Sequence, residues 1–64
     1  MKMKKFNEDK PFNMTQVLIK WADSQRLDFA YYKDGLFLVD DEWYSPKEIE
    51  SWISTEDLKK LLEI

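Results

Sequence analysis

The apolar residues of this chain fall into short patterned blocks, and each block predicts an element. The first block predicts a helix from Met14 to about Ser24, because its apolar residues recur at helical spacing. Asn13, with Gln16 three positions later, matches a capping box at the start of this helix. The residues on the apolar face are Met14, Val17, Leu18, Trp21 and Ala22, and Ile19 lies off that face.

Residues 26–32 fit either a strand or a helix. A strand groups Leu27, Phe29 and Tyr31 on one face, whereas a helix groups Leu27, Ala30 and Tyr31. The aromatic enrichment of this block and the Asp34-Gly35 turn signal after it favour the strand.

A tight hairpin is predicted next. Leu36–Val39 is a continuous apolar run, Asp40-Asp41 is a two-residue break, and Glu42-Trp43-Tyr44 returns as a strand. Together with a strand over residues 26–32, this hairpin makes residues 27–44 a three-stranded antiparallel meander.

Two short helices are predicted after the meander. Ser45-Pro46-Lys47-Glu48 is a capping box with proline at the first helical position. The helix that it starts would carry Ile49, Trp52 and Ile53 on one face. Ser54 or Thr55 then caps a third helix over residues 56–63, whose apolar face is Leu58, Leu61 and Leu62.

These elements predict a small single α+β domain with an N-terminal helix, a three-stranded antiparallel meander and two short C-terminal helices. Residues 1–12 are expected to be a flexible polar tail, and residues 13–64 the domain. The expected core is Val17, Leu18, Trp21, Leu27, Phe29, Phe37, Val39, Trp43, Ile49, Trp52, Ile53, Leu58, Leu61 and Leu62.

Composition limits how such a domain is stabilised. A chain of 64 residues forms one small domain, which buries only roughly 60% of its unfolded surface. The chain contains no Cys and no His, so disulfides and the usual structural zinc ligands are excluded. Its ten aromatic residues therefore supply the large side chains that the core needs.

Candidate chemistry is sparse. The serines have no His to activate them, and a single Gly excludes a glycine-rich phosphate loop. Asp40, Asp41 and Glu42 are adjacent in a hairpin, so their side chains point to different faces and do not converge on a metal. We expect a protein that is not an enzyme, with no catalytic residue, no metal and no cofactor.

Charge is unevenly distributed along the chain. The net charge is −3, but residues 33–57 carry eight acids and two lysines. An acidic surface repels phosphate and attracts basic partners. The candidate partner-binding site is therefore the acidic and aromatic set around the hairpin, namely Asp40, Asp41, Glu42, Trp43, Tyr44, Glu48 and Glu50.

A second interpretation takes residues 14–22 as a first helix, residues 24–34 as a recognition helix and Gly35 as the start of a wing. Trp43-Tyr44-Ser45, followed by residues 49–53, would join this wing to a final helix. In this arrangement residues 14–53 resemble the small winged-helix proteins of the excisionase type, and the resemblance implies nucleic-acid binding. The recognition helix would carry as many acids as bases, so nucleic acid is the less favoured partner.

The favoured function is non-catalytic binding to another protein, one that is basic or that itself binds nucleic acid. Small acidic chains without cofactors are typical of accessory or inhibitor proteins of phages and mobile elements that act on a host protein. A self-associating structural protein, a homo-oligomer, is the third hypothesis. We expect a soluble, cytoplasmic protein with no membrane association, because no apolar run reaches signal-peptide length or the ~20 residues of a membrane span.

Overall fold

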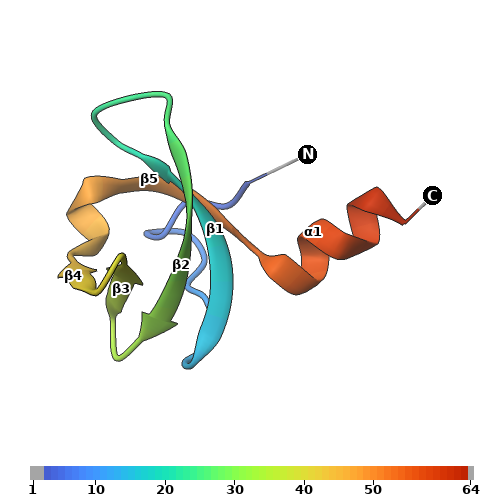
Figure 1. Ribbon diagram of the computed structural model, residues 1–64, viewed down its shortest axis with the longest axis horizontal. Coiled ribbons are helices and arrows are strands. Elements are labelled where there is room, and N and C mark those ends of the chain that lie inside the picture. The colour runs from blue at the N-terminus through green and yellow to red at the C-terminus, as the bar shows by residue number, and fades with distance from the viewer. Residues whose placement is uncertain (1–2, 64) are drawn as a thin grey trace.

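Five strands form one antiparallel sheet in the computed structural model of the chain, which describes residues 3–63. The sheet order is β4-β3-β2-β1-β5, and Figure 1 shows the sheet strongly curved, with one helix projecting from its end. The elements are β1 (Thr15–Trp21), β2 (Leu27–Lys33), β3 (Leu36–Val39), β4 (Glu42–Tyr44), the 3₁₀ turn η1 (Pro46–Glu48), β5 (Ile49–Ser54) and α1 (Thr55–Leu62).

The predicted N-terminal helix is wrong, because residues 15–21 form β1. Val17, Ile19 and Trp21 alternate toward the core, and Ile19 is 0% exposed although a helix would have left it off the apolar face. The β-branched Val17 and Ile19 pack well on a pleated surface. Asn13 does not cap a helix; its side-chain oxygen accepts a hydrogen bond from the Asp34 backbone N–H at 2.7 Å.

Residues 27–44 form the antiparallel strands β2, β3 and β4, so the strand interpretation of residues 26–32 is confirmed. The winged-helix fold is wrong for the same reason. Residues 24–34, which it takes as a recognition helix, form β2 and the loops at its ends. Both hairpins are closed by two residues with positive φ, Asp34-Gly35 and Asp40-Asp41. Two positive φ angles define a turn whose twist matches that of paired strands.

The predicted second helix is also wrong beyond its first turn. The Ser45 side chain accepts a hydrogen bond from the Lys47 N–H at 3.3 Å, as a capping residue does, but the helical conformation ends at Glu48. The chain then becomes β5 and pairs with β1 in the register Ile19↔Trp52. Pairing with β1 therefore overrides the local helical signal.

The last predicted helix is confirmed as α1. The Ser54 side chain accepts a hydrogen bond from the Asp57 N–H at 3.1 Å and caps it. None of the residues Thr55–Leu62 is buried, and α1 projects away from the sheet (Figure 1). Within residues 3–63, no helix is long and apolar enough to cross a membrane.

Most buried apolar residues form one core cluster, and the buried Leu18 and Ile53, which pair across β1 and β5, lie outside it. The predicted core is correct for Val17, Leu18, Trp21, Phe37, Val39, Ile49, Trp52 and Ile53. Leu58 is only half-buried, and the prediction is wrong for Leu27, Phe29, Trp43, Leu61 and Leu62, which are exposed. β2 faces the other way from the predicted orientation, since Ala30 and Tyr32 are buried. Aromatic residues lie on both faces of this strand, so the sequence alone does not determine which face is buried.

The described residues of the predicted tail run beside β5. Lys4 and Trp52 exchange two backbone hydrogen bonds of 2.7 and 2.8 Å. The Trp52 indole N–H donates to the Asp9 carbonyl oxygen at 2.8 Å. The Phe6 ring lies 6.0 Å from the rings of both Tyr32 and Phe37. The division into a tail, residues 1–12, and a domain, residues 13–64, stays a prediction, and these contacts make it testable.

Candidate functional site

The predicted partner-binding residues lie in three separate places. Asp40 and Asp41 form the β3–β4 turn, Glu42 to Tyr44 form β4, and Glu48 and Glu50 lie in and after η1. Glu50 is engaged within the chain, because its carboxylate lies 3.1 Å from the Lys20 ammonium group. Of the predicted residues, Tyr44 and Glu48 line one pocket together.

The β3–β4 hairpin is a protruding, solvated turn. Asp40, Asp41 and Glu42 are exposed, and Trp43 is 49% exposed. The Tyr44 hydroxyl donates a hydrogen bond to the Glu42 carboxylate at 3.0 Å. This hydrogen bond raises the pKa of Tyr44 above its ordinary 10.0, and partial burial and nearby carboxylates add to the rise.

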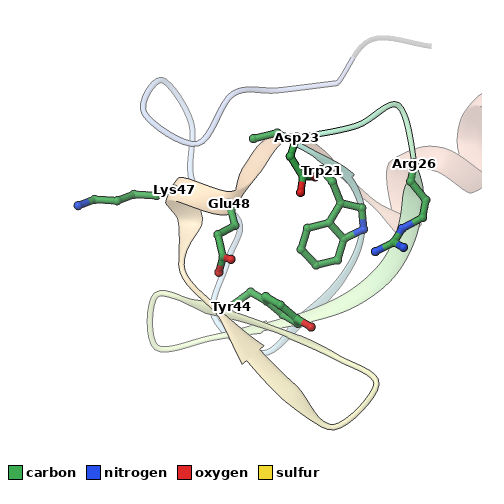
Figure 2. Close-up of a pocket in the computed structure, with 7 residues that line it drawn as sticks. Trp21, Asp23, Arg26, Tyr44, Lys47 and Glu48 are labelled. Atoms are coloured by element: carbon green, nitrogen blue, oxygen red, sulfur yellow. The ribbon is translucent and has the colours of Figure 1, made fainter.

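A pocket of about 480 Å³ lies between the end of β1, the β1–β2 loop, the end of β4 and η1. Its volume falls within the range of roughly 300–1,000 Å³ that is usual for ligand sites. The lining residues, shown in Figure 2, are Trp21, Ala22, Asp23, Arg26, Tyr44, Lys47 and Glu48.

Two aromatic rings form the floor of this pocket. The rings of Trp21 and Tyr44 meet edge to face, with centroids 4.8 Å apart and an interplanar angle of 78°. The Trp21 indole N–H donates to the Asp28 carboxylate at 2.6 Å, and Arg26 lies 3.2 Å from the same carboxylate. The Arg26 guanidinium carbon is 5.4 Å from the indole ring, within cation–π distance. These contacts fix the orientation of the indole.

Carboxylates form the wall of the pocket. Figure 2 shows the side chains of Asp23 and Glu48 directed toward the aromatic floor, whereas the Lys47 side chain points away from it. The Ala22 N–H donates to the Glu48 carbonyl oxygen at 2.9 Å and ties η1 to the end of β1. This backbone hydrogen bond holds Glu48 opposite Trp21.

Such a pocket suits a cation. Arg26 already lies at cation–π distance from the Trp21 ring, so the attraction for a further cation comes from the carboxylates, which accept hydrogen bonds from ammonium or guanidinium groups. A metal centre has less support, because within residues 3–63 no group of three or more His, Cys, Asp and Glu is placed to hold an ion.

Sequence reasoning missed most of the lining. Trp21 was assigned to the core, and it is indeed 6% exposed, but its ring also forms the pocket floor. The sequence predicts Asp23 at the end of the first helix and Arg26 at the start of the next block. One signal points to these residues: residues 23–26 are all polar between two apolar blocks, as in a loop, and binding residues are disproportionately found on loops.

The comparisons with family models, curated proteins and solved structures found no match to this chain.

Proposed function

We propose that the chain is a non-catalytic protein-binding module that holds a basic side chain of a partner protein in the pocket lined by Trp21, Tyr44, Asp23 and Glu48. The single observation that carries this proposal is the pairing of an aromatic floor with two inward carboxylates, Asp23 and Glu48. Aromatic residues are enriched where proteins bind one another, and they dominate the binding energy there.

The charge of the pocket supports a protein partner over a nucleic acid. Asp23 and Glu48 line the pocket, and their carboxylates would repel phosphate groups. Arg26 is already paired with Asp28, and Lys47 points out of the pocket. Asp23 and Glu48 have no ion pair within residues 3–63, so a lysine or arginine of the partner would meet two carboxylates.

The absence of His and Cys from the chain excludes nucleophile–base pairs such as Ser–His and Cys–His, which agrees with a binding role. An accessory or inhibitor role toward a host protein remains a more specific form of this proposal, and identification of the partner would test it.

Selection from a random peptide library displayed on a carrier tests the proposal directly. The chain is immobilised, and the enriched peptides are measured against wild type and two variants. The pocket variant is Asp23→Asn with Glu48→Gln, and the control is Asp40→Asn with Asp41→Asn, which removes the same charge from the hairpin. Asn also tolerates the positive φ of the two control positions.

We expect peptides rich in lysine or arginine whose affinity falls about tenfold or more in the pocket variant, a loss of the size that charge-assisted contacts support. The control should bind as wild type does. Peptides that bind the pocket variant normally and the hairpin variant poorly would move the site to Asp40–Asp41. Neutral peptides, or no enrichment, would contradict the proposal.

A further inference from the structure

Arg26 is the only arginine of the chain, and it lines the pocket beside the Trp21 ring (Figure 2). Its guanidinium carbon is 5.4 Å from the centre of that ring, and its Nε lies 3.2 Å from the Asp28 carboxylate. The same carboxylate accepts the Trp21 indole N–H at 2.6 Å. The Trp21 ring and the Asp28 carboxylate thus form a seat for a guanidinium group, and the chain fills this guanidinium seat itself.

The backbone of Arg26 is fixed, whereas its side chain is mostly solvated. The Arg26 carbonyl oxygen accepts the Trp21 backbone N–H at 3.1 Å, and the Arg26 N–H donates to the Ser24 hydroxyl at 3.2 Å. The side chain is 70% exposed. Ion pairs and cation–π contacts are both weak at exposed sites. The Arg26 side chain can therefore leave the guanidinium seat while the β1–β2 loop keeps its fold.

The guanidinium seat suits an arginine of the partner better than a lysine. A guanidinium group is planar, so it stacks on a ring face and donates hydrogen bonds in its own plane, whereas a lysine ammonium group is a compact point charge. Arg26 itself shows that a guanidinium fits there. Building on the function proposed above, we infer that Arg26 is an internal competitor and that an arginine of the partner binds by taking its place over Trp21.

The exchange gives the incoming arginine more than Arg26 loses. It meets the Trp21 ring and the Asp28 carboxylate as Arg26 does, and Asp23 and Glu48 line the same pocket. While Arg26 stays, a partner cation has only these two lining carboxylates to bind, and the charge of Arg26 opposes it. Arg26 therefore sets both the affinity of the pocket and its preference for arginine.

The size of the effect follows from the two contacts that hold Arg26 in place. A site that is vacant for only a fraction of the time binds with an affinity reduced by that fraction. An exposed ion pair and an exposed cation–π contact each favour the occupied state by a factor of about 2 to 5. Together they should reduce the apparent affinity for an arginine side chain by about tenfold.

Titration of the isotope-labelled chain with N-acetyl-arginine amide, followed by NMR, tests the inference. Arg26→Gln removes the competitor from an exposed position, and Asp28 still accepts the Trp21 indole N–H. We expect this variant to bind the arginine probe about tenfold more tightly than wild type. N-acetyl-lysine amide should gain less from the substitution, because its ammonium group does not reproduce the planar contacts.

Two further measurements separate competition from net charge. Lys47→Gln removes the same positive charge from a residue that lines the pocket but points away from its floor (Figure 2), so its affinity should stay within about threefold of wild type. The Arg26 Nε–H gives a unique signal, because the chain has no other arginine. Addition of the probe to wild type should move this signal to the position of a solvated arginine.

The outcomes distinguish this inference from the proposed function. Equal probe affinities of Arg26→Gln and wild type, an equal gain in Lys47→Gln, or an Arg26 Nε–H signal that stays in place at saturation would each overturn the inference. The pocket variant, Asp23→Asn with Glu48→Gln, tests the proposed function separately, because it should bind the probe more weakly whether or not Arg26 competes. Absence of binding to both wild type and Arg26→Gln would contradict both.

Discussion

Phe6 tests whether the N-terminal segment is part of the folded domain. The Phe6 ring is half-buried and contacts the rings of Tyr32 and Phe37, both of which are buried. Removing a fully buried Phe costs about 3–5 kcal/mol, so Phe6→Ala should cost about 2 kcal/mol at this half-buried position. A chain of this length has a total stability of roughly 3–10 kcal/mol, so the loss would be a large fraction of it.

The assay is urea unfolding followed by tryptophan fluorescence, supported by thermal unfolding. A loss of about 2 kcal/mol should lower Tm by about 8–16 °C in a domain of this size. Phe12→Ala is the matched control, because Phe12 belongs to the same predicted tail but is 86% exposed. We expect its free energy of unfolding to stay within about 0.5 kcal/mol of wild type.

Equal, small effects of the two substitutions would refute this reasoning. Residues 1–12 would then be the flexible tail that the sequence predicts, and the Lys4–Trp52 pairing would contribute little in solution. Amide hydrogen exchange at Trp52 gives an independent reading, because its backbone N–H donates to the Lys4 carbonyl oxygen.

Three further predictions concern the hairpin turns and β4. Gly35→Ala should destabilise the domain by about 1 kcal/mol in urea unfolding, because φ is +82° and the added Cβ contacts nothing, so that the cost is conformational. Asp41→Gly should stabilise it by about 1 kcal/mol in the same assay, since Asp41 has a φ of +66°. Glu42→Gln should lower the pKa of Tyr44 toward 10.0 in an ultraviolet absorbance titration, because the carboxylate that accepts its hydrogen bond loses its charge. Because the pKa of Tyr44 is raised in the folded state, its hydrogen bond to Glu42 adds stability below the ordinary pKa of 10.0. That added stability is lost as pH rises through the folded-state pKa of Tyr44.

Each of these predictions has a contrary outcome. An unchanged stability of Gly35→Ala would mean that the turn adopts another conformation. A loss of stability in Asp41→Gly would assign Asp41 a contact that outweighs its backbone strain. An unchanged titration of Tyr44 in Glu42→Gln would show that the hydrogen bond does not form in solution.

The sequence predicted the meander and the last helix because their signals are local. Asp34-Gly35 and Asp40-Asp41 specify two-residue turns, and Ser54 caps α1 through its own third neighbour. The sequence predicts a helix in place of β1 because Val17 and Trp21 satisfy both spacings and Leu18 fits the helical one. Ile19 was the residue that distinguished the two, since it fits only the strand.

The region after Ser45 shows why local rules are insufficient. The capping interaction predicted there exists, but pairing of Trp52 with Ile19 decides the conformation of residues 49–54. The pocket could not be predicted for the same reason. Trp21, Tyr44 and Glu48 meet only because β5 returns to β1 and places η1 beside the end of that strand.

The pairing of Lys4 with Trp52 also protects an edge of the sheet against aggregation. β5 has β1 on one side only, and its other edge would otherwise offer unpaired backbone groups at Trp52 to any extended chain. At the opposite end of the sheet, β4 has only three residues and begins with a charged glutamate. Both edges are thus poor templates for intermolecular strand addition. Displacement of the N-terminal segment would expose the longer edge and open a route to aggregation.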